Sequence, residues 1–312
     1  MGDPGYESLE DSEALRSGAR VGPRLFKASE PIDGSRIYYD FMRPTNDEQD
    51  LERELDRLAS LDPDILKTYV RLRYSFQERA IAFVHRLGLP AFSHYWAQPL
   101  AFGQDGISHI TATQRLGFSR TQSPSGFAYE DIVKSAGAWR MSMTSTLFSS
   151  TTLLADDPGL ATDPRVTTLY TPWQRDELDE DLKTATTTDQ TNTRVGLQRS
   201  VGILNAILDA GGRVPAGTDI PLDPVAVDLH LNLRAMVRYG LTPYEALRTS
   251  TFQPARQMGL ERDFGAVAPG KVADLAIVRG DPLADIDDAA AVQMVMTDGR
   301  LRSVGSLLAP WR

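Results

Sequence analysis

Residues 64–72 (DILKTYVRL) carry three long polar side chains at strand spacing. Side chains on a strand alternate between two faces, so one face of this segment is mainly apolar and the other presents Lys67, Tyr69 and Arg71. In a barrel of parallel strands and outer helices, the apolar face packs against helices and the polar face points inward, toward the C-terminal mouth. A lysine there is costly unless it is paired or modified. We therefore predict a site lysine; the alternative is a surface strand with a solvated lysine.

Two of the four histidines end strand-like segments. His94 closes the strand predicted over residues 89–95, and His109 follows fifteen residues later in ISHI. Barrel enzymes keep their catalytic groups at these strand ends. One such histidine is usually a core or surface residue, but two on successive strands predict contact with a metal or a substrate. His85 and His230 fall in predicted helices and are predicted to be structural.

A carboxylate ends a further predicted strand. Asp219 closes RVPAGTD, just before Pro221 interrupts the chain. A carboxylate at this place takes a proton from a metal-activated water and later delivers it to a leaving amine. The alternative is an N-cap for the next helix.

The elements that must position these residues alternate between helix and strand, which is typical of an α/β protein with a parallel sheet. Thr45 is the predicted N-cap of the second helix. Residues 156–193 are predicted to form long loops with short helices. About six barrel strands are predicted rather than eight, with the shortfall at the beginning. We expect helices over 7–18, 46–60, 76–88, 197–212, 228–240 and 242–259, and strands over 22–32, 64–72, 89–95, 107–110, 139–148 and 213–219.

The last fifty residues change character. They alternate with period two, and turn signals stand at Pro269-Gly270, Gly280-Asp281 and Asp298-Gly299. This pattern predicts a small β-module appended to the barrel. The predicted domains are therefore residues 1–262, the barrel, and residues 263–312, the β-module.

Composition narrows the chemistry. The 312 residues include no cysteine, so thiolate metal sites and cysteine nucleophiles are excluded, and any metal must be held by nitrogen and oxygen. The net charge of −9 argues against a nucleic-acid partner. We see no signal peptide and no apolar run of the roughly 18 residues that a membrane span needs. The chain as written is thus expected to be cytoplasmic.

Several motifs together resemble the amidohydrolase superfamily, in its imidazolonepropionase and Xaa-Pro-dipeptidase-like branch. Some members of that branch carry a secreted domain ahead of the barrel. The resemblance covers nearly the whole chain and is loosest over residues 118–193. It is carried, in order and spacing, by LKTYVRL, HRLGLPAFSHY, GISHI, AGTD, LTPYEALRTSTFQPARQMGL and GAVAPGKVADLAIVRGDPLADI.

The resemblance implies a distorted TIM barrel with a small β-sandwich, and a site for one or two divalent metals, usually zinc. By position, Lys67 matches a lysine that is carbamylated and bridges two metals. His94 and His109 match two further metal ligands, and Asp219 matches an aspartate that is both ligand and proton shuttle. Tyr69 and Arg71 are candidates for contacting a substrate carbonyl or carboxylate oxygen. The expected reaction is hydrolysis of an amide or related C–N bond in a small or dipeptide-like substrate.

One family motif is missing. The first strand of the family supplies an H-x-H pair, and this sequence contains none. Met1 is expected to fall just after the second barrel strand, through a truncation, a late start codon or degeneration. An open barrel would expose strand edges, which favours oligomerisation. Two alternatives therefore stay open: a non-catalytic barrel fragment, and a deaminase-type reaction on the same metal.

Overall fold

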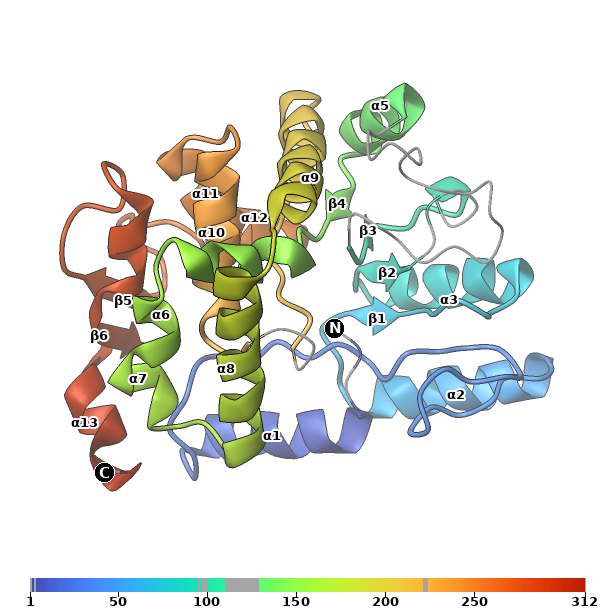
Figure 1. The fold of residues 1–312 in the computed structure, drawn as a ribbon. Helices are drawn as coiled ribbons and strands as arrows, with labels where there is room; N and C mark the ends of the chain where they lie inside the picture. Colours follow the sequence, from blue (N-terminus) through green and yellow to red (C-terminus); the bar gives the residue numbers. More distant parts are fainter. Residues whose placement is uncertain are drawn as a thin grey trace. The chain divides into compact units, whose positions relative to one another are not determined.

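The structure is a computed structural model that describes residue 2 and residues 4–94, 96, 100–109, 129–220 and 224–311. It divides into two compact units (Figure 1). Unit 1 comprises Met1–Ser123, Ala128–Thr144 and Ala210–Arg213, and unit 2 comprises Pro124–Phe127, Ser145–Asp209 and Val214–Arg312. Each unit is described by itself.

Unit 1 is built on a parallel sheet of order β1-β2-β3-β4. Isolated parallel bridges add residues 28 and 32 beside the first strand and residue 213 beside the last. Strand and helix alternate along this part of the chain, so the predicted α/β class with a parallel sheet is confirmed. The elements are α1 (Gly5–Ser17), α2 (Glu48–Ser60), β1 (Leu66–Lys67), α3 (Tyr74–Arg86), β2 (Ala91–Ser93), β3 (Gly106–Ile107), α5 (Glu130–Trp139) and β4 (Ser142–Met143).

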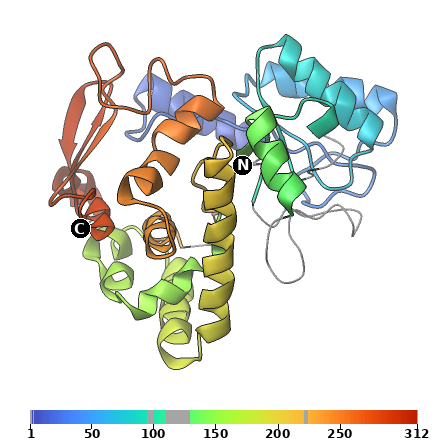
Figure 2. The same cartoon turned by 90° about the horizontal axis from the view of Figure 1, so that it is seen from above.

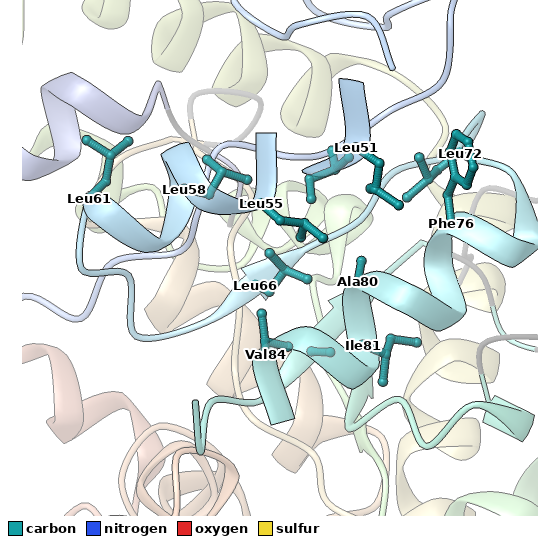
Figure 3. Packing of buried hydrophobic residues seen from close by; sticks show 12 residues of the cluster. Leu51, Leu55, Leu58, Leu61, Leu66, Leu72, Phe76, Ala80, Ile81 and Val84 are labelled. Atoms are coloured by element: carbon teal, nitrogen blue, oxygen red, sulfur yellow. The ribbon is translucent and has the colours of Figure 1, made fainter. Parts of the chain in front are cut away.

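The core of unit 1 lies between the sheet and helices α2 and α3 (Figure 3). Leucines spaced three or four residues apart give α2 one apolar face, which is the spacing that turns a helix toward a core. Leu66 of β1 and Ala91 of β2 belong to the same buried cluster. This face of the sheet is therefore apolar, as predicted, and the opposite face is left for the polar side chains.

The N-cap of α2 differs from the prediction. Asp47, not Thr45, caps the helix, because the Asp47 carboxylate accepts a hydrogen bond of 2.9 Å from the Asp50 amide. Thr45 is buried two residues earlier. A carboxylate at this place also suits the positive end of the helix dipole.

The strand predicted over residues 64–72 ends early. After Thr68 the backbone turns, and the Leu72 amide donates to the Tyr69 carbonyl at 3.4 Å. Val70 was predicted to pack against the helices. Because of this turn it packs instead with Met42 and Tyr69, outside the α2–α3 core. The strand predicted over residues 22–32 is absent apart from isolated bridges at Ala28 and Ile32, and those predicted over 89–95, 107–110 and 139–148 are shorter than expected. Residues 95 and 110, at two of their ends, lie outside the described residues.

The strand predicted over residues 213–219 is mostly irregular. Arg213 bridges to Ser142, but residues 214–219 form no regular ladder. Pro215 has no amide hydrogen to donate, which interrupts strand pairing. The Pro215 carbonyl still accepts a hydrogen bond from the Ser145 amide at 3.0 Å.

Unit 2 is mainly helical, and α9 is its longest helix among the described residues (Figure 2). Residues 156–193, predicted to form long loops with short helices, are largely helical. The predicted helix over residues 242–259 is two helices, because Pro254 cannot donate the hydrogen bond that would continue the first. The elements are η1 (Phe148–Ala155), α6 (Gly159–Thr162), α7 (Pro164–Thr167), α8 (Pro172–Thr187), α9 (Thr191–Asp209), α10 (Asp228–Arg238), α11 (Pro243–Thr249) and α12 (Phe252–Gln257).

The chain ends in the antiparallel sheet β5-β6-β7, which confirms a small β-module. The hairpin between β6 and β7 turns at Asp298 and Gly299, whose φ angles of 50° and 73° suit a two-residue turn with left-handed backbone. The elements are β5 (Leu275–Val278), η2 (Ile286–Ala290), β6 (Val292–Thr297), β7 (Arg300–Ser303), α13 (Val304–Leu308) and η3 (Ala309–Trp311). Among the helices that the structure describes, none is long and apolar enough to cross a membrane.

Candidate functional site

Three of the predicted site residues stand at the C-terminal ends of three neighbouring strands in unit 1. Lys67 is the last residue of β1, His94 directly follows β2, and His109 follows β3 after one intervening residue. The parallel register pairs Lys67 with Phe92, and Phe92 with Gly106. The strand ends are therefore level with one another, as the sequence spacing predicts.

The sheet register also decides which side chains share a face. Counting on by twos from the paired residues places Lys67, Tyr69, His94 and Ser108 on one side of the sheet. Phe92 lies on this side too, against Gly106, where an added Cβ would overlap the Phe92 ring. A residue without a side chain is therefore required at the start of β3.

Lys67 is completely buried. Its Nζ contacts the Ser108 hydroxyl, and its backbone amide donates to Ser29 Oγ at 2.9 Å. Sequence reasoning missed Ser108, although its position beside His109 in ISHI was the available signal. Because a buried ammonium loses its hydration, this environment favours pairing or covalent neutralisation of the lysine.

His94 is buried, and its ring centroid lies 4.9 Å from that of His109. Burial, helped by the positive charge of Lys67 and by His109, holds the pKa of His94 well below its ordinary value. His94 is thus a neutral imidazole at neutral pH. A neutral imidazole offers one ring nitrogen as an acceptor or metal ligand.

Two predicted site residues have left-handed backbone. His109 has a φ of 70° and Asp219 a φ of 53°. Outside glycine this conformation is uncommon and costs on the order of 1–3 kcal/mol, and it concentrates at functional sites. Both residues therefore hold a conformation that local preferences alone do not favour.

Tyr69, a predicted substrate contact, is buried beside His94. The two rings meet edge to face with centroids 4.6 Å apart. The Tyr69 hydroxyl donates to the Tyr39 hydroxyl at 3.3 Å. Tyr69 therefore links His94 to residues 33–41, the segment that follows residue 32.

Arg71, the other predicted substrate contact, holds that same segment. One guanidinium nitrogen donates to the carbonyls of Arg36 and Ile37, at 3.0 and 2.7 Å. The Arg71 amide donates to the Asp33 carboxylate at 2.6 Å. Burial raises the pKa of Asp33, while backbone donors and Arg71 oppose that rise. Asp33 was not predicted from the sequence, because its contact is with a residue 38 positions away.

Asp219 belongs to unit 2, so its distance from the two histidines stays a prediction. Within its own unit, the strand-like segment before it is fixed by hydrogen bonds from the Ala216 amide to the Thr249 carbonyl and from the Gly217 amide to Ser145 Oγ, at 2.7 and 3.3 Å. The next described helix, α10, begins at Asp228. Asp219 therefore does not cap it.

The two remaining histidines have other surroundings. His85 on α3 contacts the Asp105 carboxylate at 2.8 Å, and the same carboxylate accepts a hydrogen bond from the Ala91 amide. His85 thus supports the start of β2. His230 lies on α10 in unit 2, where burial, together with the charges of Arg234 and Arg165, lowers its pKa to about 4.

The residues on the sheet fit a divalent metal in their chemistry. The described residues contain no cluster of three or more His, Cys, Asp or Glu side chains placed to hold one. The donors would therefore be His94, His109 and a modified Lys67. Two neutral imidazoles and a carbamate oxygen are ligands that zinc accepts.

Comparisons with known proteins show which families the chain resembles. The model of the family described as "Amidohydrolase family" matches residues 165–302. Adenine deaminase 3 of Rhizobium meliloti is 30% identical over 124 residues, which is 35% of this chain and 20% of the relative. The chain thus spans about a fifth of the length of that curated relative.

Solved structures extend the likeness to nearly the whole fold. A Xaa-Pro dipeptidase with bound methionine superposes with a TM-score of 0.67 at 17% identity, covering 97% of this chain and 74% of that one. A putative prolidase from Bifidobacterium longum gives 0.66 at 18% identity, covering 100% and 76%. The resemblance to the amidohydrolases is confirmed, and the likeness to the Xaa-Pro-dipeptidase-like proteins is one of fold. At these identities the solved structures show the fold alone.

Proposed function

We propose that this chain, whose resemblance to the amidohydrolases is confirmed, is a metal-dependent hydrolase of an amide or related C–N bond. The observation that carries the proposal is the convergence of Lys67, His94 and His109 at level ends of three parallel strands. The family match over residues 165–302 is independent support, because those three residues lie outside it.

The metal would be held by the imidazoles of His94 and His109, and by Lys67 after carbamylation. In that modification the neutral Lys67 amine forms an N–C bond with CO₂ and releases one proton. When bound, a divalent metal lowers the pKa of water toward neutrality and polarises a carbonyl. Zinc suits these donors best, and the two-metal alternative requires a further ligand.

The chain's own residues supply the proton transfer and the substrate contacts. Asp219 would accept the proton of the attacking water and deliver it to the leaving amine, so that the C–N bond breaks without releasing an unprotonated amide anion. Tyr69 and Arg71 would contact a substrate carbonyl or carboxylate oxygen. His94, being neutral, would not repel the metal.

The test combines metal content with hydrolysis of dipeptides, N-acyl amino acids and cyclic amides. His94→Ala and Lys67→Ala should each lose metal and activity. Asp219→Asn should lower kcat by about 10²- to 10⁴-fold, the usual contribution of a positioned acid–base group. His85→Ala is the matched control, since it removes a histidine that contacts Asp105 outside the proposed site. Equal activity of the three site variants and the parent would refute the assignment.

A deaminase reaction is the second candidate, favoured by the similarity to adenine deaminase 3. Incubation with adenine and measurement of released ammonia separates it from amide hydrolysis. The third candidate is a non-catalytic fragment. A purified chain with no bound metal, and with no activity after metal is added, would favour that candidate over both enzymes.

A further inference from the structure

Three aromatic side chains on the segment after residue 32 form a platform. The rings of Tyr39 and Phe41 are stacked, with centroids 5.3 Å apart and an angle of 5° between their planes. Tyr38 meets Tyr39 edge to face at 4.8 Å. Their exposed fractions are 52% for Tyr38, 37% for Tyr39 and 36% for Phe41. Each ring therefore keeps part of its surface in contact with solvent.

The aromatic platform (Tyr38, Tyr39 and Phe41) is continuous with the candidate site. Tyr69 lies 5.2 Å from Tyr38 and 5.5 Å from Tyr39 between ring centroids, and its other side meets His94. A row of rings thus runs from the exposed Phe41 to the buried His94 and the half-buried His109. A group resting on the platform would adjoin anything bound at His94.

The segment that carries the platform is held in place by several contacts. Arg71 donates to two of its carbonyls and places its guanidinium 5.2 Å from the centroid of Tyr38. At Gly34 an added Cβ would overlap the Arg71 carbonyl, so the two backbone segments approach closely. The Asp33 carboxylate fixes the Arg71 amide from the other side. The platform is therefore preorganised, which reduces the entropy cost of binding.

One ring of the platform already has a cationic partner, because the guanidinium of Arg71 lies over the Tyr38 ring. The three platform rings are themselves uncharged, and the exposed Asp40 stands between Tyr39 and Phe41 in the chain. Parallel ring faces at Tyr39 and Phe41 instead suit another flat ring, which gains stacking energy that an aliphatic group of similar size does not.

We infer that the aromatic platform binds an uncharged aromatic ring of the substrate, with any nearby negative charge directed toward Arg71. This inference rests on the proposed function for its location beside a hydrolytic site. It assigns substrate specificity to Tyr39 and Phe41, neither of which is a proposed metal ligand.

Binding of two ligands without a C–N bond tests this inference separately from catalysis. The probes are 3-phenylpropionate and 4-methylpentanoate, which share a carboxylate and differ in ring against branched chain. Titrations with the full chain should show tighter binding of 3-phenylpropionate. Phe41→Leu and Tyr39→Leu should each weaken that binding about two- to tenfold, the usual value of aromatic contacts, and change 4-methylpentanoate binding by less than about twofold.

Trp139→Leu is the matched control, because Trp139 is also an exposed aromatic residue of unit 1 and lies on α5. It should bind both probes as the parent does. Unchanged binding of 3-phenylpropionate to both platform variants would overturn the inference, as would equal losses for the two probes. A change of oligomeric state in the platform variants would assign the platform to self-association instead. If the chain hydrolyses no substrate but still binds 3-phenylpropionate more tightly than 4-methylpentanoate, only the proposed function is refuted.

Discussion

His230 should make unit 2 sensitive to mild acid. The residue is largely buried on α10, and its pKa of about 4 lies below the ordinary value of 6.5. Burial is the main cause, and Arg234 and Arg165 add to it by repelling a second positive charge. Arg234 is itself paired with Asp157 and Asp287, at 2.7 and 2.8 Å. Arg234 therefore remains fixed near the imidazole.

The direction and the size of the stability change follow from the pKa of His230 in the folded and unfolded chain. Between pH 6.5 and about 4 the unfolded chain binds a proton at His230 that the folded chain does not, so stability falls as the pH falls. The whole shift is worth about 3 kcal/mol, at about 1.4 kcal/mol per unit. From pH 7 to pH 5 the loss from His230 should be about 2 kcal/mol.

Urea unfolding of the full chain at both pH values measures this loss. His230→Gln removes the titrating group, so this variant should lose about 2 kcal/mol less than the parent between pH 7 and pH 5. His85→Gln, which removes an exposed histidine of unit 1, should retain the parent's loss. If the parent and His230→Gln lose equal stability on acidification, the electrostatic reasoning about His230 is wrong.

Three further changes test the packing that supports the site. Gly106→Ala should cost about 1–3 kcal/mol in urea unfolding, because its Cβ would overlap the Phe92 ring, and a neutral effect would contradict that packing. Asn232→Ala should cost about 1–3 kcal/mol of stability, because it leaves buried polar groups without this partner. Asn232 donates to the Asp228 carboxylate at 2.8 Å and accepts from the Leu147 amide at 2.9 Å, and all three residues are buried. A thermal midpoint equal to the parent's would refute this. Asp47→Ala should cost about 1 kcal/mol, whereas Asp47→Ser, which retains a cap, should lose less.

Alternation along short strands made the sheet side of the site predictable. The two-residue spacing of Lys67 and Tyr69 predicts that both share a face, and both do, although the regular strand ends at Lys67. Parallel pairing then aligns the ends of successive strands, so the register continues to His94 opposite Ser108, and His109 follows one residue later. These inferences needed only the local period and the direction of the strands.

Polar contacts between distant residues were not predictable in this way. Nothing in the sequence pairs Asp33 with the Arg71 amide or Ser108 with the amine of Lys67, since both contacts depend on the packed sheet. Helix α8 was missed for a different reason: its residues are acidic and threonine-rich, with little apolar periodicity. It is started by the Thr171 and Gln174 capping box with Pro172 in the first turn.

The proposed function draws on two parts of the chain that support it in different ways. Unit 1 holds Lys67, His94 and His109: the sheet register places Lys67 and His94 on one face, and the His109 ring lies 4.9 Å from that of His94. Unit 2 holds Asp219 within the stretch that matches the family. If both parts serve one reaction, His94→Ala should lose metal and turnover together, whereas Asp219→Asn should lose turnover more than metal. A chain in which the two variants fail in the same way would assign Asp219 to holding the metal rather than to proton transfer alone.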